Sequence, residues 1–82
     1  MEVEKGYLVK KSTRKHKKYD VYHNNKYLLS FGDNRYQQYY DKIGSYSKLN
    51  HNDLNRKRLY YARHGETNDK NSAKYWSNKY LW

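Results

Sequence analysis

The stretch Lys17–Phe31, which reads KKYDVYHNNKYLLSF, predicts a β-hairpin. Two runs rich in tyrosine, valine and leucine flank the pair Asn24-Asn25. Asparagine adopts positive φ angles more readily than any residue except glycine, so a two-residue type I′ turn at this pair would close the hairpin. The resulting register places Tyr22 opposite Tyr27, and such an aromatic pair stabilises a hairpin by up to about 1 kcal/mol.

The same register extends along the hairpin, and a further strand precedes it. Beyond the tyrosine pair, the register joins His23 with Lys26, Val21 with Leu28, and Asp20 with Leu29. Upstream, Gly6–Lys11 reads GYLVKK, and its side chains alternate as they do along a short strand. Gly32 is expected to end the second strand of the hairpin.

Downstream of the hairpin, the spacing of apolar residues changes from two to three and four. Within Arg35–Asn50, the residues Tyr36, Tyr39 and Ile43 recur at this spacing. The pattern predicts one or two helical turns that end before Gly44. The rest of the segment is expected to be a tyrosine-rich loop.

A clearer helix follows Asn50. This residue is a candidate N-cap, with Asp53 in the first turn of the helix. Gly65 is the expected stop, and the last turn before it holds Arg63 and His64, where cations are favoured. Helical spacing gathers on one side of this helix the residues Leu54, Tyr61 and Ala62.

A last helix is expected to start at about Asn71, with Asp69, Asn71 or Ser72 as its cap. Trp76 and Trp82 lie within the final seven residues. Such large aromatic side chains predict that the tail packs against the rest of the chain.

Length and order of elements together predict a single α+β domain. The chain has 82 residues, which suits one small basic domain spanning residues 1–82. We expect a small antiparallel sheet, formed by the hairpin and the N-terminal strand, with two or three helices packed on one face. With 12 tyrosines and no proline, the chain is expected to fold despite its mean hydropathy of −1.53.

Several classes of protein are disfavoured by what the sequence lacks. Without cysteine, the chain offers no disulfide, thiolate nucleophile or cysteine-type zinc site. Its apolar runs fall far short of the roughly 18 residues of a membrane span, and its acidic start, MEVEKGYLV, does not resemble a signal peptide. We therefore expect a soluble protein that is not secreted and has no membrane partner.

Positive charge is the main functional signal. The 18 lysines and arginines outnumber the 8 acidic residues, and the net charge of +10 predicts an anionic partner. The densest run, Lys10–Lys18, reads KKSTRKHKK and contains no acid. This composition is typical both of a solvated, mobile loop and of a loop that contacts phosphates, and the sequence leaves both interpretations open.

One short motif resembles a catalytic signature. Arg63–Asn68 reads RHGETN and resembles the histidine phosphatase and phosphoglycerate mutase superfamily, in which the histidine becomes phosphorylated and the arginine holds the phosphate. In that family the motif follows the first strand of a large α/β domain. Only 15 residues follow Thr67 here, and none is histidine or arginine. We interpret the match as coincidental, at a helix end, and expect no enzyme activity and no small-molecule substrate.

The remaining polar residues do not indicate a catalytic or metal site. The four histidines lack metal-site spacing, so no metal and no cofactor is expected. Isolated carboxylates among cations are typical of ion-pair partners rather than acid–base catalysts, and this interpretation covers Asp20, Asp33, Asp41 and Asp53.

A longer pattern runs along nearly the whole chain. It consists of KSTRKHKKY at Lys11–Tyr19, the pair Phe31-Gly32, Asp53 with Arg56 and Arg63-His64 on the helix, and WSNKYLW at Trp76–Trp82. This pattern resembles a family of small basic proteins found mainly in large DNA viruses of eukaryotes and in some phages. The chain departs from the pattern at Asn52, where the family has lysine. The family has no settled biochemical function, so the resemblance implies a viral setting, in the virion or the host-cell interior, and no reaction.

Charge and resemblance together suggest two functions. The first is a non-enzymatic viral accessory protein that binds DNA or RNA through its phosphates, with the contact set Lys10, Lys11, Arg14, Lys15, Lys17, Lys18, Arg56, Arg58 and Arg63. The alternative is a virion structural protein, a minor capsid or internal component, because tyrosine, tryptophan and arginine are enriched in protein interfaces. Its interface with other viral proteins would comprise Tyr36, Tyr39, Tyr40, Trp76 and Trp82.

Overall fold

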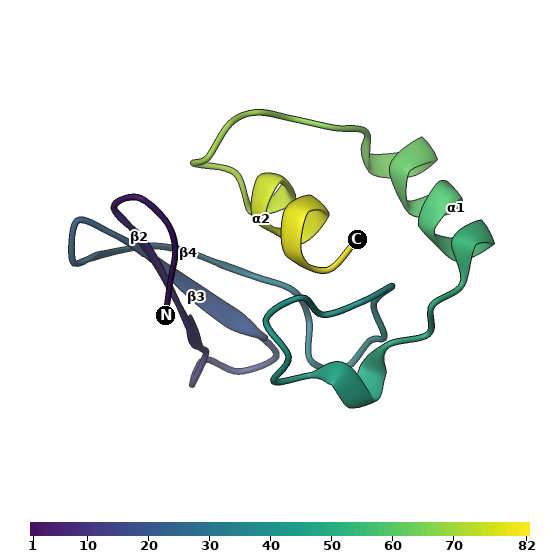
Figure 1. Ribbon diagram of the computed structural model, residues 1–82, viewed down its shortest axis with the longest axis horizontal. Helices are drawn as coiled ribbons and strands as arrows, with labels where there is room; N and C mark the ends of the chain where they lie inside the picture. The colour runs from purple at the N-terminus through teal and green to yellow at the C-terminus, as the bar shows by residue number, and fades with distance from the viewer.

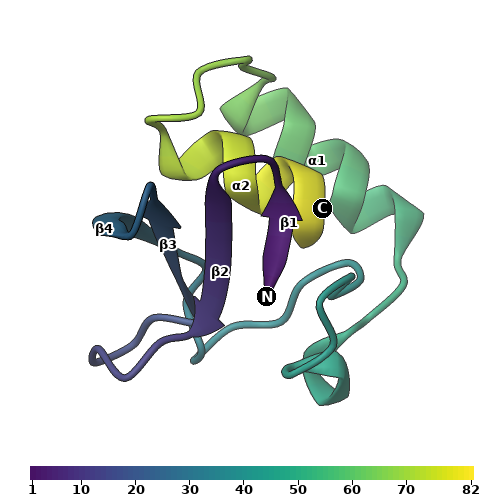
Figure 2. The same ribbon diagram turned by 60° about the vertical axis from the view of Figure 1, so that its left-hand side comes forward.

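A computed structural model describes all 82 residues and shows a four-stranded antiparallel sheet with both α-helices on one side of it (Figure 1 and Figure 2). The strands lie in the sheet in chain order. This architecture confirms the predicted α+β class. The elements are β1 (Glu2–Glu4), β2 (Tyr7–Lys11), β3 (Tyr19–His23), β4 (Lys26–Phe31), the 3₁₀-helix η1 (Ser47–Leu49), α1 (Leu54–His64) and α2 (Ala73–Tyr80).

The predicted hairpin forms between β3 and β4. Asn24 and Asn25 adopt φ angles of 51° and 68°, as a type I′ turn requires. His23 pairs with Lys26 and Tyr22 with Tyr27, which confirms the predicted register next to the turn.

A β-bulge overturns the rest of the predicted register. Val21 pairs with Leu29 instead of Leu28, and Asp20 pairs with Ser30 instead of Leu29. Because side chains alternate along a strand, the predicted register would have turned Ser30 toward the core and Phe31 toward solvent. The extra residue in β4 reverses this, so that Phe31 is buried beside Tyr19.

The N-terminal strand region contains a hairpin where the sequence indicated one strand. The predicted strand corresponds to β2, and β1 pairs with it antiparallel, with Glu2 opposite Leu8. Gly6 makes the connecting turn at a φ angle of 81°. A strand of only three residues is too short to produce a period of two, which explains why the sequence pattern did not indicate it.

The core lies between the sheet and α2. Its buried apolar residues are Val9, Tyr19, Val21, Phe31, Trp76 and Leu81. Trp76 is fully buried, with its ring centroid 5.2 Å from that of Tyr7. Ser72, one of the three predicted caps, begins α2 by accepting a hydrogen bond from the backbone N–H of Lys74 at 3.2 Å. The C-terminal tail therefore packs as predicted.

α1 begins later than predicted, and only part of its predicted apolar side packs. Its N-cap is Asp53, whose carboxylate accepts from the backbone N–H groups of the first turn, and Gly65 ends it as predicted. The predicted apolar side is wrong for Leu54 and Ala62, which are exposed, whereas Tyr61 is half-buried and its hydroxyl donates to the backbone carbonyl of Asn78 in α2 at 3.1 Å. α1 also contacts the tail through Tyr60, which stacks on Trp82 with 4.4 Å between ring centroids. Regular spacing could not indicate this contact, because Trp82 lies beyond the helix that follows.

The predicted helical turns between Tyr36 and Ile43 do not form. The carboxylate of Asp41 accepts hydrogen bonds from the backbone N–H groups of Ile43, Gly44 and Tyr46. These side-chain contacts compete with helical hydrogen bonds and turn the chain locally. Asn50, predicted as a helix cap, accepts from the Gln38 side chain at 2.6 Å and from the backbone N–H of Asp41 at 2.7 Å.

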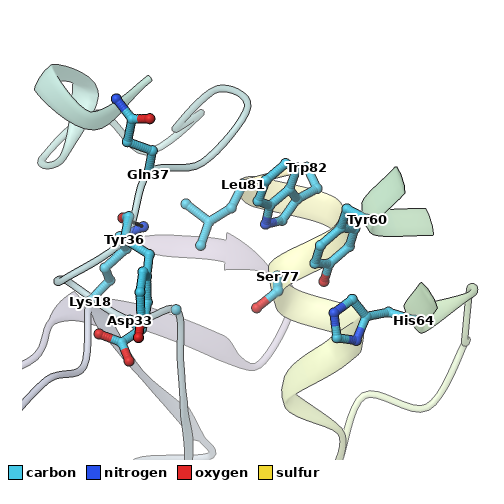
Figure 3. A pocket seen from close by; sticks show the side chains of 10 residues that line it. Lys18, Asp33, Tyr36, Gln37, Tyr60, His64, Ser77, Leu81 and Trp82 are labelled. Carbon is cyan, nitrogen blue, oxygen red and sulfur yellow. Dashed lines mark hydrogen bonds between the residues drawn. The ribbon is translucent and has the colours of Figure 1, made fainter. Parts of the chain in front are cut away.

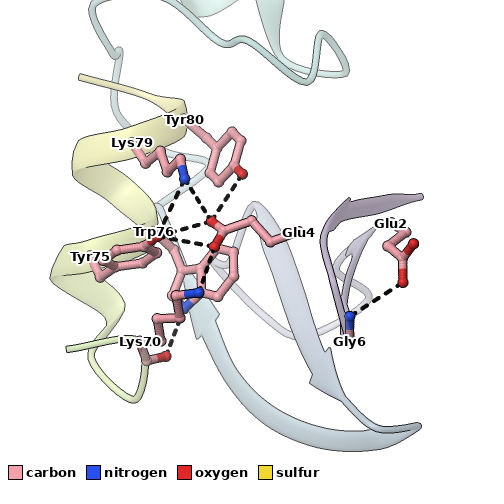
Figure 4. A network of polar contacts seen from close by, with 8 residues as sticks. All are labelled: Glu2, Glu4, Gly6, Lys70, Tyr75, Trp76, Lys79 and Tyr80. Atoms are coloured by element: carbon pink, nitrogen blue, oxygen red, sulfur yellow. Dashed lines mark hydrogen bonds and ion pairs between the residues drawn. The ribbon is translucent and has the colours of Figure 1, made fainter. Parts of the chain in front are cut away.

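Glu4 ties the N-terminus to α2 and the segment before it (Figure 4). Its carboxylate pairs with the ammonium groups of Lys70 and Lys79, each at 3.0 Å, and accepts hydrogen bonds from the hydroxyls of Tyr75 and Tyr80. Burial alone would raise the pKa of Glu4, but the hydrogen bonds from Lys70, Lys79 and Tyr75 outweigh it and lower the pKa to about 2.

Replacing Glu4 by glutamine is therefore expected to lower the free energy of unfolding by about 1–2 kcal/mol at neutral pH, allowing for solvent screening at the half-exposed lysines. The folded-state pKa lies below the ordinary 4.5, so this stabilisation is complete above that pH. It disappears as the pH falls toward 2, and the difference between wild type and Glu4→Gln should close over that range when measured by denaturant unfolding. Glu2→Gln is the control, because the exposed Glu2 carboxylate accepts only from the backbone N–H of Gly6.

Two glycines with positive φ angles provide a second test of the fold. Gly32 has a φ angle of 76°, and a Cβ atom there would lie 2.9 Å from Leu81 Cδ1 and from Lys18 Cδ, both on buried side chains. Gly65 has a φ angle of 69° with no atom within 4 Å of such a Cβ. Gly65→Ala is expected to cost about 1 kcal/mol for its backbone conformation, and Gly32→Ala about 1–3 kcal/mol more because it also overpacks the core. Equal losses in thermal or denaturant unfolding would contradict the packing at Gly32.

Candidate nucleic-acid interface

The cationic loop between β2 and β3 comprises residues 12–18 and has a defined path. The backbone N–H of Ser12 donates to the carbonyl of Lys18 at 2.9 Å, which closes the loop. The Ser12 hydroxyl accepts from the backbone N–H of Arg14 at 3.0 Å. His16 turns the chain with a φ angle of 64°. The run of like charge is therefore presented on a hydrogen-bonded turn at the end of the sheet.

Four lysines in and next to the loop are exposed and carry no ion pair: Lys10, Lys11, Lys15 and Lys17. Arg14 is also exposed, and its Nε lies 3.7 Å from the carboxylate of Asp20. Five of the six predicted loop contacts are thus accessible to a phosphate group.

Lys18, the sixth, is wrong as a phosphate contact. The residue is 2% exposed, and its ammonium group donates to the backbone carbonyl of Tyr36 and to Oε1 of Gln38. Burial lowers the pKa of Lys18 to about 8, although Asp41 and Asp33 act in the opposite direction. Lys18 lies just before β3, so the alternation of that strand does not set its direction. Its side chain instead packs against Gly32, and Tyr36 and Gln38 accept from its ammonium group.

The three predicted arginines on α1 form a separate group. Arg56, Arg58 and Arg63 are exposed, and Arg56 donates to the side chain of Gln37 at 2.8 Å. Figure 2 shows the β2–β3 loop at the lower left and α1 at the upper right of the molecule. The structure thus divides the predicted contact set into a loop group and a helix group.

The predicted protein interface is also divided. Trp76 is fully buried in the core and Trp82 is partly buried against Tyr60, so neither tryptophan is a free surface residue. Tyr36 and Tyr40 are exposed, whereas Tyr39 is half-buried beneath the ammonium of Lys57, 4.6 Å from its ring.

Two tyrosines that sequence reasoning left out of the site lie beside the loop. Tyr22 and Tyr27 face each other across β3 and β4 with 6.0 Å between ring centroids. The guanidinium of Arg14 lies 4.0 Å from the centre of the Tyr27 ring. The alternation of β3 could have indicated them, because Tyr22 follows Val21 and must point away from the core.

The molecule has one pocket, of about 430 Å³, between the end of α1, the C-terminal tail and the segment after β4 (Figure 3). His64 lines it, together with Tyr60 and Ser77, but Arg63 does not. Both motif residues lie in the last turn of a helix, as predicted for RHGETN, rather than after a strand. The two side chains that would share a phosphate in the phosphatase signature therefore do not meet in this pocket.

No group of three or more histidine, aspartate or glutamate side chains is close enough to hold a metal ion. Neither α-helix is long and apolar enough to cross a membrane. Searches of protein-family models, of curated proteins and of solved structures find no match to this chain.

The neighbours Lys17 and Lys18 provide a test of the loop. Lys18→Ala is expected to lower the free energy of unfolding by about 1–3 kcal/mol, because Gln38 and Tyr36 lose their buried donor. Lys17→Ala removes the same charge from an exposed position and should change stability by less than about 0.5 kcal/mol. The pKa of Lys18 is about 8 against an ordinary 10.5, so wild type gains stability relative to Lys18→Ala as the pH rises above 8.

Denaturant unfolding of both variants at several pH values measures these differences. Equal stability of the two variants at all pH values would contradict the burial of Lys18.

Proposed function

We propose that this protein binds nucleic acid through phosphate contacts made by the cations of the β2–β3 loop, with the α1 arginines as a second contact group. The binding involves no reaction. The resemblance described above supports a viral setting. The protein would be a viral accessory protein in the virion or the host-cell interior. The phosphate-contacting set, without Lys18, is Lys10, Lys11, Arg14, Lys15, Lys17, Arg56, Arg58 and Arg63.

One observation carries the proposal. Lys10, Lys11, Lys15 and Lys17 are exposed on and beside one hydrogen-bonded turn, and none has a carboxylate within 4.0 Å. Only two lysines of the protein form ion pairs, Lys70 and Lys79, and both pair with Glu4. Other exposed lysines without ion pairs, such as Lys42 and Lys48, lie outside this run of adjacent cations. Concentrated, unpaired positive charge is favourable where counterions or polyanions neutralise it, and a phosphate backbone supplies such a polyanion.

A second candidate, a virion structural protein, is favoured by exposed apolar and aromatic side chains away from the loop. Tyr36, Tyr40, Leu54 and Leu59 are all exposed. Such residues can form the centre of a protein interface. Recovery of the protein from purified particles in fixed proportion to a capsid protein, and cross-linked to it through α1 or the Tyr36–Tyr40 segment, would favour this function over the first.

Salt dependence tests the first function. If about five cations contact phosphates, the affinity for duplex DNA should fall with salt at a log–log slope of about −4 to −5. The double variant Lys15→Gln/Lys17→Gln is expected to make the slope shallower by about 2, because two phosphate contacts are lost. Fluorescence anisotropy with a labelled duplex over a range of salt concentrations measures this slope.

The matched control is Lys42→Gln/Lys48→Gln, which removes the same charge from exposed residues outside the contact set. Its slope should stay close to that of wild type. A similar change in both double variants would mean that net charge alone governs binding. Absence of affinity for both DNA and RNA at low salt would exclude the proposed function.

A further inference from the structure

The side of the sheet opposite α2 carries aromatic rings and cations. Paired residues on neighbouring antiparallel strands point to the same side of a sheet. Val9, Val21 and Leu29 thus face α2 and the core, and the residues that alternate with them face away. These outward residues form what we call the open face: Leu8, Lys10, Asp20, Tyr22, Tyr27 and Ser30. No helix covers it in either ribbon view (Figure 1 and Figure 2).

Two tyrosine rings lie side by side on the open face, near the Asn24-Asn25 turn. Tyr22 and Tyr27 meet edge to face, with 76° between their ring planes. Tyr27 is 44% exposed. Its hydroxyl is 2.8 Å from the Ser30 hydroxyl, which donates to the carboxylate of Asp20 at 2.6 Å. This chain of hydrogen bonds fixes the phenol tip to the sheet and leaves the ring available to a planar ligand.

Cations lie over both rings. The Lys10 ammonium is 5.2 Å from the centre of the Tyr22 ring, and the Arg14 guanidinium is 4.0 Å from that of Tyr27. The two acidic residues on this side of the sheet, Asp20 and Glu2, do not cancel the positive charge near the two rings. Asp20 is buried beneath Arg14 and Ser30, and Glu2 lies on the edge strand β1, opposite Leu8.

We propose that the open face binds single-stranded nucleic acid, with unpaired bases stacked on Tyr27 and Tyr22 and the flanking phosphates held by Lys10 and Arg14. This inference rests on the proposed function and specifies the form of nucleic acid. A duplex keeps its base faces stacked inside the helix, whereas a single strand can offer them to aromatic side chains. A base that stacks on a ring displaces the cation over it, and that cation is then next to the phosphate of the same nucleotide.

The combination of aromatic rings and positive charge on the open face indicates which kind of partner binds there. An apolar protein partner would leave Lys10 without a counter-charge and Arg14 with Asp20 alone. An acidic protein would gain little from the exposed ring of Tyr27 and the half-exposed ring of Tyr22. A single strand satisfies both groups at once, because each nucleotide carries one planar base and one negative phosphate. The loop continues the same cationic track from Arg14 to Lys15 and Lys17.

The first experiment uses the wild-type protein and two probes that differ only in their bases. One is a single-stranded oligothymidylate of about 15 nucleotides, and the other is an abasic strand of the same length and charge. Stacking on at least one tyrosine should make the base-containing strand bind about 5- to 100-fold more tightly in an anisotropy titration. Equal affinity for the two strands would overturn the inference and leave phosphate binding intact.

Variants then assign the stacking to the open face. Tyr27→Ala is expected to lose about 5- to 100-fold in affinity for oligothymidylate and to keep its affinity for the abasic strand. Tyr27→Phe retains the ring and should bind like wild type, although it lacks the hydroxyl that contacts Ser30. Tyr36→Ala is the matched control, because Tyr36 is also exposed but lies outside the open face. A larger loss from Tyr36→Ala than from Tyr27→Ala would overturn the inference.

The outcomes separate this inference from the function on which it rests. No binding to any nucleic acid at low salt would exclude both. Binding to oligothymidylate, abasic strand and duplex with equal affinity, insensitive to Tyr27→Ala, would exclude only the stacking face. Thermal unfolding of each variant checks that the sheet is intact, and the two-probe comparison with wild type decides the question even if Tyr27→Ala does not fold.

Discussion

The hydrogen bond from the Tyr19 hydroxyl to Asp41, at 2.6 Å, is the contact on which much of the remaining structure depends. The chain has few aliphatic residues, so the core includes the ring of Tyr19, which is fully buried. A buried hydroxyl without a partner would be costly, and Asp41 provides the acceptor. Burial, followed by the hydrogen bond to Asp41, raises the pKa of Tyr19 and keeps its hydroxyl protonated as a donor. The sheet and the segment after it are therefore built around one carboxylate.

The same requirement recurs at two other buried side chains, Trp76 and Lys18. The indole N–H of Trp76 donates to the backbone carbonyl of Lys70 at 2.9 Å, which ties the linker before α2 to the core. Lys18 donates to Gln38, and Gln38 in turn donates to Asn50. A core made of amphipathic side chains thus generates a polar network, and this network orders a loop that has almost no regular secondary structure.

Side chains that stabilise the fold are not available to bind a partner. Lys18, Lys70 and Lys79 serve the fold, whereas the lysines around the β2–β3 loop are left unpaired. Tyrosines divide in the same way. Tyr19 is in the core, while Tyr27 is exposed on the side of the sheet that no helix covers. The residues available for binding are therefore the tyrosines and lysines that do not stabilise the fold.

The sequence by itself determined the features that depend on local physical chemistry: the Asn24-Asn25 turn, the Tyr22 and Tyr27 pair, the Gly65 stop of α1 and the α+β class. These follow from backbone preference and alternation between neighbours. Only the tertiary structure decided which tyrosines and lysines are buried. A single β-bulge shifts the register of β4 by one residue. The carboxylate of Asp41, 22 residues after Tyr19, accepts the hydrogen bond that allows the Tyr19 hydroxyl to be buried. In this chain the core and the surface use the same residue types, so composition cannot show which residues belong to the core. The packing of segments that are distant in the sequence determines it.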